Sequence, residues 1–232
     1  MNERMFSLGA RLEACADFVR KGRVVADIGT DHAYLPIWLA LTEKVSRAYA
    51  SDINDEPIKV ARENIERYNL HDKIITFTGI GLEKIPPDDV DDVVIAGMGS
   101  DNIVGILDAA KWLKNRRYRL ILQPMSRVEK LREYLYRNNF DIVNEKAVCE
   151  ANRVYTVICA EYSDTAIDFS EFNFYAGGLS NKDECSRKLL KKQAYVLLSE
   201  AEGHAKRGDF KGEQRLKKTA GELMNYVNEG EN

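Results

Sequence analysis

From about residue 24 to residue 160, short β-rich runs alternate with segments in which the apolar residues have a helical spacing. Short runs rich in Val, Ile and aromatic residues predict strands. Between these runs, apolar residues such as Ile58, Ala61 and Ile65 recur every three or four positions, which predicts helices. The predicted strands are Val24–Gly29, Arg47–Ile53, Ile75–Ile80, Val93–Met98, Arg119–Met125, Phe140–Val148 and Val154–Tyr162.

Strands that alternate with helices indicate βαβ units around a parallel sheet with both faces covered. The last two runs differ, because the five residues Cys149–Arg153 between them are too few for a crossover helix. We therefore expect an α/β fold with a seven-stranded, mostly parallel sheet, in which the last two strands form an antiparallel hairpin and one strand is reversed. An amphipathic helix that packs over this sheet is predicted before the first strand by Leu8, Leu12, Cys15 and Val19.

The β-rich pattern ends at Tyr162, and the rest of the chain has a helical pattern. Ser180 and Asp183 are both candidate N-caps for the first long helix, and Gly208-Asp209 stops it and starts a second. A spacing of four and three residues between apolar positions predicts an antiparallel coiled-coil hairpin. Its seam positions are Leu190, Ala194, Leu197, Ala201 and His204, then Leu216, Ala220, Leu223 and Val227. We therefore divide the chain into an α/β domain, residues 1–162, and a helical hairpin, residues 163–232.

Composition limits the class of protein without naming a function. The 232 residues are 44% hydrophobic and 31% charged, which is typical of a globular protein and not of a disordered or fibrous one. No apolar run approaches the roughly 20 residues that span a bilayer, and residues 1–10 lack the pattern of a signal peptide. We therefore expect a cytoplasmic protein that has no membrane partner. For the oligomeric state we expect a monomer or a weak dimer.

The cysteine and histidine residues give no metal-binding pattern. Cys15, Cys149, Cys159 and Cys185 are scattered and contain no C-x-x-C pair. This spacing predicts reduced thiols, with neither a zinc site nor a disulfide framework. The three histidines are also dispersed, so no metal is expected.

Acidic residues stand at the ends of the first two predicted strands. The first strand runs into Asp27-Ile28-Gly29-Thr30-Asp31-His32, and the second ends in Ser51-Asp52-Ile53-Asn54. Ligands of open α/β sheets bind at the carboxyl ends of strands, where Gly29 lets the backbone approach a ligand and Asp52 can accept hydrogen bonds from a ribose diol. Taken singly, Asp27 as a helix cap and Asp52 as a solvated strand end are equal alternatives. At matched strand ends, the two favour a nucleoside ligand.

The charge of the first turn separates two nucleoside cofactors. A dinucleotide site has the pattern G-x-G-x-x-G, so that a pyrophosphate can rest on the helix N-terminus. Here Asp31 stands at the place of the second glycine, and a carboxylate there repels a pyrophosphate. S-adenosylmethionine carries a sulfonium and an ammonium instead of phosphates. The pattern therefore favours a methyltransferase over a dehydrogenase.

Two further strand ends agree with this ligand. Gly79-Ile80-Gly81-Leu82 follows the third strand, where the adenine ring of the donor would lie, and Ala96-Gly97-Met98-Gly99-Ser100 follows the fourth, where the methyl group would meet its acceptor. These glycines also suit plain βα turns. The fourth strand end lacks the Asn or Asp followed by Pro-Pro-aromatic that is common in enzymes that methylate exocyclic amines. A ring nitrogen such as adenine N1 needs no amine activation, so its methylation fits this strand end better.

Four motifs together resemble one family. Asp27–Pro36 (D-I-G-T-D-H-A-Y-L-P), Ser51–Asn54, Ile95–Gly99 and Leu122–Met125 closely resemble the bacterial tRNA adenine-22 N1-methyltransferase family, over essentially the whole chain. The resemblance implies a Rossmann-like class I methyltransferase fold, S-adenosylmethionine as donor and tRNA as acceptor. The chain departs from the family where Ile80 replaces an Asp and Ser100 replaces a Gly. The first departure removes a carboxylate contact to the adenine amine of the donor.

The strand ends and the resemblance together assign residues to the donor. They are Asp27, Gly29, Thr30, Asp31, His32, Asp52, Ile53, Asn54, Gly79, Gly81, Leu82, Ala96, Gly97, Met98 and Gly99. For catalysis we expect direct in-line transfer to adenine N1, helped by positioning. Asp31 and His32 are the candidates beside the reacting atoms, and Tyr34 can stack on a base that is extruded from the tRNA. Gln123 and Pro124 are candidates on the acceptor side.

Charge is unevenly placed, so the net charge of −3 does not exclude RNA. Residues 182–218 contain 11 Lys and Arg against 6 Asp and Glu, and a second basic cluster lies at residues 111–119. Local positive potential is enough for phosphate contacts, although solvated helix faces have the same composition. The candidate tRNA contacts are Arg187, Lys188, Lys191 and Lys192.

Three rival hypotheses remain open. The chain can be a methyltransferase for a small molecule or a protein, an inactive donor-binding protein that interacts with RNA, or a dehydrogenase. The basic hairpin disfavours the first rival and Asp31 the third, whereas Ile80 and Ser100 suggest the second.

Overall fold

Seven strands form a single sheet in the computed structural model, which describes residues 6–231. The order across the sheet is β3-β2-β1-β4-β5-β7-β6. The strands are β1 (Arg23–Ile28), β2 (Val45–Asp52), β3 (Ile74–Thr78), β4 (Asp92–Met98), β5 (Arg119–Pro124), β6 (Phe140–Glu150) and β7 (Arg153–Tyr162). β7 is antiparallel to both of its neighbours, and the other pairs are parallel. The predicted sheet with one reversed strand in a terminal hairpin is confirmed.

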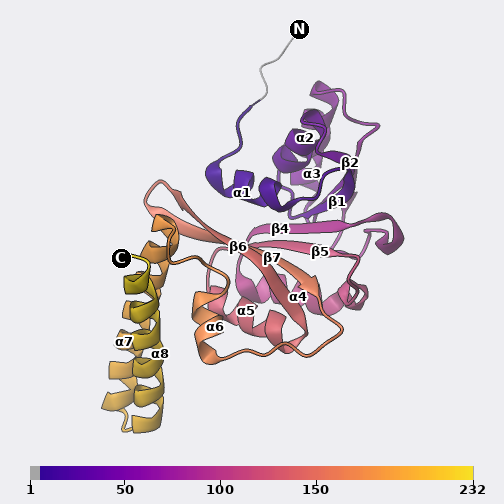
Figure 1. The fold of residues 1–232 in the computed structure, drawn as a ribbon. Helices are drawn as coiled ribbons and strands as arrows, with labels where there is room; N and C mark the ends of the chain where they lie inside the picture. Colours follow the sequence, from indigo (N-terminus) through magenta and orange to yellow (C-terminus); the bar gives the residue numbers. More distant parts are fainter. Residues whose placement is uncertain (1–5, 232) are drawn as a thin grey trace.

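Helices cover both faces of the sheet (Figure 1). α1 (Ala10–Phe18), α2 (Tyr34–Leu41) and α3 (Asp55–Arg67) pack on one face, whereas α4 (Ser100–Ala109) and α5 (Val128–Arg137) pack on the other. Two short 3₁₀ turns, Pro87–Asp89 and Lys111–Leu113, lie in the connections. The predicted first helix is present and packs on β4 to β7. Alternation along the strands explains the two layers, because successive side chains point to opposite faces.

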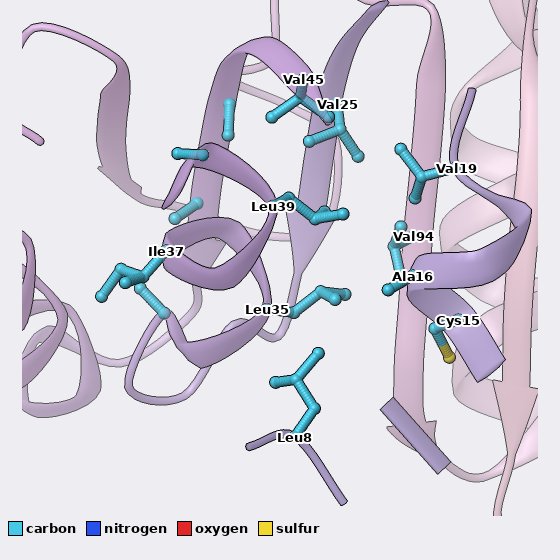
Figure 2. Close-up of a cluster of buried hydrophobic side chains, with 14 of the residues drawn as sticks. Leu8, Cys15, Ala16, Val19, Val25, Leu35, Ile37, Leu39, Val45 and Val94 are labelled. Atoms are coloured by element: carbon cyan, nitrogen blue, oxygen red, sulfur yellow. The ribbon is translucent and has the colours of Figure 1, made fainter. Parts of the chain in front are cut away.

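The core on the α1–α3 face is drawn in Figure 2. Val25 of β1 and Val94 of β4 point into this layer, together with Leu35 and Leu39 of α2 and Val19 after α1. Each of these side chains is at least 98% buried, and burial of a side chain of this size contributes about 1.5–3 kcal/mol. This packing holds the carboxyl ends of β1 and β4 in fixed positions.

The chain after β7 forms three helices, one more than the sequence pattern predicted. The additional helix, α6 (Glu171–Ala176), begins with a capping box between Ser170 and Asn173. α7 (Glu184–Lys206) and α8 (Phe210–Glu229) form the predicted antiparallel hairpin, which extends away from the sheet (Figure 1). Asp183 caps α7 through the Ser186 amide, so Asp183 is the cap of the two candidates.

The seam between α7 and α8 contains the predicted apolar residues with one exception. Leu190, Ala194, Leu197 and Ala201 are buried against Leu216, Ala220, Leu223 and Val227. His204 lies at the end of this seam, next to Gly212 of α8, and makes a polar contact there. Its Nδ1 lies 2.7 Å from Asp209 Oδ2 at the hairpin turn, and its side chain is 29% exposed. The Asp209 carboxylate gives the imidazole a polar partner where the apolar seam ends.

A buried ion pair joins the α/β domain to the segment that leads to the hairpin. Arg132 of α5 donates to Glu145 of β6, with an Nη2–Oε1 distance of 2.7 Å, and both side chains are fully buried. The same arginine donates to the carbonyls of Phe174 and Tyr175 in α6, and Glu145 also accepts from the Gly178 amide. These bonds satisfy both charges and fix the segment after β7 on the sheet.

The expectation of four reduced thiols is wrong for two of them. Cys149 at the end of β6 and Cys185 at the start of α7 form a disulfide with a Cα–Cα distance of 5.7 Å. Sequence spacing did not indicate this pair, because β6 and α7 meet only in the folded chain. Cys15 and Cys159 are free and buried. The disulfide is a second link between the sheet and the hairpin.

Candidate functional site

The turn after β1 has an unusual backbone. Gly29, Asp31 and Ala33 all have positive φ angles, of 74°, 52° and 60°. The Gly29 and Thr30 amides both donate to the Ser51 carbonyl at the end of β2. Positive φ is uncommon for residues other than glycine and costs free energy. Two such residues in one turn mark it as a segment whose shape is held by its surroundings.

Gly29 suits its position because of its positive φ, and it lies directly beside the Met98 side chain. A Cβ built on Gly29 would lie 2.2 Å from the Met98 methyl carbon at the end of β4. β1 and β4 are neighbours in the sheet, and Ile28 is opposite Ile95 in the register. The Gly29 turn and the Met98 turn are therefore in direct contact at the carboxyl edge of the sheet.

Asp27 is a buried carboxylate at the end of β1. It is 6% exposed, and it accepts a hydrogen bond of 2.6 Å from the Thr30 hydroxyl. Burial raises its pKa from 3.8 to about 6, the Thr30 bond opposes the rise, and the Asp52 carboxylate adds to it. No cationic side chain lies within salt-bridge distance of Asp27 in residues 6–231. A buried anion in this state suits a cationic ligand group.

Asp31, His32 and Tyr34 lie together after the turn, on its solvent side. Asp31 Oδ1 is 3.6 Å from His32 Nε2, and the Asp31 side chain is 70% exposed. The Tyr34 ring is 46% exposed and makes an edge contact with the His32 ring. His32 Nδ1 is buried and has no hydrogen-bond partner within the described residues. The structure thus brings the three candidate catalytic residues together at the predicted position.

Asp52 lies at the end of β2, next to the first turn. Its Oδ1 accepts from the Asn54 amide at 2.9 Å, and its carbonyl accepts from the Gly79 amide after β3. One carboxylate oxygen therefore has no hydrogen bond from the protein within residues 6–231. Ile53 is 61% exposed beside it. A partly exposed carboxylate beside an exposed apolar side chain is suited to a ribose with an attached ring.

The turn after β3 forms the edge of an apolar pocket of about 710 Å³. Gly81 has a φ of 53°, and a Cβ built on it would lie 3.2 Å from Ile106 of α4, whereas the Leu82 side chain is buried in the core. Ile80, which replaces the family's acid, is 66% exposed and lines the same pocket. The pocket continues along α4 to Trp112. An apolar wall is therefore present where the sequence predicts the donor's adenine ring.

Gln123 links three elements at the end of β5. Its side chain is fully buried, its Oε1 accepts from the Gly97 amide and from Arg11 Nη1 at 2.6 Å, and its Nε2 donates to the Pro124 carbonyl. The side-chain amide is thus used within the protein, and a contact of Gln123 with the acceptor stays a prediction. Sequence reasoning missed Arg11, because it lies in a helix before the first strand and outside the βα pattern.

Ser100, the second departure from the family pattern, has a clear structural role. It is the first residue of α4, it is 1% exposed, and its hydroxyl donates to the Ser126 carbonyl at 2.7 Å. The bond ties the turn after β4 to the turn after β5. Ala96 and Gly97 lie in the last residues of β4, where the register shifts and Gly97 has a φ of 80°, and Gly99 is the N-cap of α4.

The candidate tRNA contacts on α7 differ in their availability. Arg187 and Lys191 interact with Glu231, and Lys188 pairs with Glu184. Lys192 is exposed and has no carboxylate within salt-bridge distance in the described range. The second basic cluster, residues 111–119, lies before β5 at the opposite edge of the sheet. Its side chains contact Asp108, Asn138, Asp164, Asp91 and Glu161.

The charges at the carboxyl edge of the sheet suit a cationic nucleoside ligand, because Asp27, Asp31 and Asp52 all lie at the ends of β1 and β2 or in the turn after β1. The contacts of Asp27 and Asp31 with the donor's ammonium and sulfonium, and of Asp52 with its ribose, stay predictions. Residues 6–231 contain no group of His, Cys, Asp and Glu arranged to hold a metal ion. No helix in the same range is long and apolar enough to cross a membrane.

Comparison with known proteins gives a consistent result. Residues 8–158 match the methyltransferase domain family. A tRNA (adenine(22)-N(1))-methyltransferase of Bacillus subtilis is 37% identical over 179 residues, which are 77% of this chain and 74% of that protein. The crystal structure of the B. subtilis m1A22 tRNA methyltransferase superposes on this chain with a TM-score of 0.81 and 31% sequence identity. The superposition covers 97% of this chain and 98% of the B. subtilis chain.

A structure with bound donor is also similar. The structure of Streptococcus pneumoniae Sp1610 in complex with S-adenosyl-L-methionine superposes with a TM-score of 0.80 and 29% sequence identity. The superposition covers 95% of this chain and all of the Sp1610 chain. The fold, the domain match and the identity to a curated relative agree with each other. The chain belongs to the tRNA (adenine(22)-N(1))-methyltransferase family.

Proposed function

We propose that this protein transfers a methyl group from S-adenosylmethionine to N1 of adenine 22 in tRNA. The observation that carries the proposal is the acidic edge formed by Asp27, Asp31 and Asp52 around the Gly29 turn, in a chain that belongs to this family. The donor supplies a methyl group activated by its sulfonium. The protein supplies a site that favours positive charge and excludes a pyrophosphate.

The residues act mainly by holding and orienting the donor. Asp27 is buried, so an ionised Asp27 binds an ammonium more strongly than an exposed carboxylate would. Asp52 fixes the ribose, and the apolar wall at Ile80 covers the ring. Catalysis by positioning is effective here, because adenine N1 is a neutral nucleophile and the leaving thioether is a good one.

The acceptor needs a different kind of help. N1-methyladenine carries a positive charge that develops in the transition state, and the Asp31 carboxylate at the open side of the turn stabilises that charge. Tyr34 offers an exposed aromatic ring beside Asp31, on which an extruded base can stack. No covalent intermediate with the protein is required.

The test is a direct assay of the product. The full-length protein is incubated with labelled S-adenosylmethionine and unmodified bulk tRNA, and the tRNA is digested to nucleosides. We expect label in N1-methyladenosine, and none when adenine 22 is replaced in a single tRNA transcript. Label in another nucleoside would contradict the assignment of the acceptor atom.

Two other outcomes identify the rival functions. Turnover of the donor without tRNA, on a small molecule or a protein, would indicate a methyltransferase of another substrate class. Donor binding with no transfer to any tRNA would indicate an inactive RNA-interaction protein.

The cytoplasm is the compartment that fits a tRNA substrate. Disulfides rarely persist there, because the thiol pool keeps cysteines reduced. The redox state of Cys149 and Cys185 in the cell is therefore a test of this localisation.

A further inference from the structure

A cleft of about 390 Å³ lies between the α/β domain and the helical hairpin. Three segments form its walls: the end of β5 with the turn into α5 (residues 124–129), the β6–β7 turn with the first residues of β7 (residues 152–156), and one side of α7 around Lys192. None of the donor residues lines it. The cleft is thus a site separate from the one that holds the donor.

The sheet places this cleft next to the reacting edge. β7 is antiparallel to β5, with Leu122 opposite Ile158, so β7 begins at the edge where β5 ends. Met98 of the β4 turn is opposite Pro124, which lines the cleft. Neighbouring strands are about 4.8 Å apart, so the cleft begins roughly one strand spacing beyond the turn where methyl transfer is expected.

The charge of the cleft is positive. Arg127, Arg153 and Lys192 line it, against the single carboxylate of Glu129. Arg127 is paired with Asp101, and Glu129 accepts a hydrogen bond from Gln193. Arg153 and Lys192 are exposed, and in residues 6–231 neither has a carboxylate within salt-bridge distance. They stand on opposite walls, one on the sheet and one on the hairpin.

The walls of the cleft are held in place before any ligand binds. The Cys149–Cys185 disulfide joins β6 to the start of α7. The Arg132–Glu145 pair and the hydrogen bond from Thr156 to Glu145 anchor the sheet wall and the segment before α7. A preformed site reduces the cost of ordering on binding.

We propose that this cleft binds the sugar–phosphate backbone of the tRNA strand next to the target adenine, with Arg153 and Lys192 as phosphate contacts. The inference rests on the proposed function and adds to it the place where the strand enters. Phosphates are favoured as the ligand, because the free cations face each other across a polar cleft open to solvent. The position beside the β4 turn directs the attached base toward the donor.

The test compares two double charge reversals in the full-length protein. R153E/K192E removes both phosphate contacts. K21E/K73E makes the same change in net charge at exposed lysines before β1 and β3, at the opposite edge of the sheet. Binding of an unmodified tRNA transcript is measured at several salt concentrations, and donor affinity is measured by calorimetry.

We expect R153E/K192E to raise the Kd for tRNA at least tenfold, whereas K21E/K73E changes it less than threefold. The slope of log K against log salt should become shallower by about two for the cleft variant alone. Donor affinity should stay within twofold of the parent for both variants. Equal effects of both double variants on tRNA binding would overturn the cleft assignment while leaving the proposed function intact. A parent protein that neither binds nor methylates tRNA would overturn both.

Discussion

Thr30 donates a 2.6 Å hydrogen bond to the buried Asp27 carboxylate, within the turn that follows β1. This bond stabilises the charged form of Asp27, but burial outweighs it and leaves the pKa of Asp27 at about 6. The folded protein therefore holds, at the carboxyl edge of its sheet, a buried carboxylate whose charged form is only partly stabilised. The pH dependence of both stability and donor binding follows from this arrangement.

Donor affinity should rise with pH through about 6, because only the ionised form of Asp27 attracts an ammonium. Calorimetric titration with S-adenosylmethionine between pH 5 and pH 8 measures this change. T30V removes the opposing hydrogen bond and should move the midpoint to higher pH. An affinity that stays flat across this range would show that Asp27 does not bind the donor's charge.

Stability should respond to pH in the opposite direction. Between 3.8, the ordinary pKa of Asp, and about 6, the folded protein binds more protons than the unfolded chain. Its free energy of unfolding therefore falls as pH rises through this window, by about 3 kcal/mol in all for this one group. D27N should be more stable than the parent at pH 7.5, equally stable near pH 4, and deficient in donor binding. Urea unfolding of both proteins at the two pH values checks this trade between stability and function.

Asp31 provides a second functional prediction. D31A should abolish methyl transfer, because it removes the carboxylate beside the reacting atoms and also replaces a residue with a φ of 52°. D31N separates these effects, since Asn tolerates positive φ almost as well as Asp. We expect D31N to retain the parent's thermal stability and to lose at least 100-fold in kcat/KM. Equal activity of D31N and the parent would exclude an electrostatic role for this carboxylate.

How much of this molecule can be predicted from its sequence depends on the range of the interactions. Strand–helix alternation predicted the sheet, and the short link from Cys149 to Arg153 predicted its reversed strand, because both are local patterns. The acidic strand ends predicted the candidate donor site, since parallel strands bring their carboxyl ends together. Arg11 was missed because its partner Gln123 is 112 positions away.

The disulfide and α6 escaped prediction for related reasons. Cys149 and Cys185 meet only because the hairpin folds back on β6. α6 is only six residues long, which is too short to show an apolar period, and its position depends on bonds from Arg132 to its carbonyls. A contact across the hairpin turn also sets the environment of His204, whose Nδ1 lies 2.7 Å from Asp209 Oδ2.

The Arg132–Glu145 pair should dominate the stability of the junction. E145Q leaves a buried guanidinium without its counter-charge and should lower the free energy of unfolding by about 3–5 kcal/mol. The matched control is E161Q, which removes the partner of Arg119 in a pair whose side chains are 26% and 30% exposed and should cost about 1 kcal/mol or less. Urea unfolding followed by tryptophan fluorescence measures both. A similar, small cost for the two variants would show that the buried pair is not needed.

The disulfide should stabilise the folded chain by limiting the freedom of the unfolded one. It closes a loop of 36 residues, which corresponds to roughly 4 kcal/mol in the chain-entropy description. Reductant should therefore lower the Tm of the parent, and should have no effect on the Tm of C149S/C185S.

Alkylation distinguishes the cysteines, because burial raises the pKa of Cys15 to about 12 and that of Cys159 to about 11, so both stay unreactive at neutral pH. Rapid alkylation of intact cells then reports on the Cys149–Cys185 pair alone. Modification of these two cysteines would indicate a reducing compartment in which the pair is open. Protection of both would indicate that the disulfide forms in the cell and that the cytoplasmic assignment is wrong.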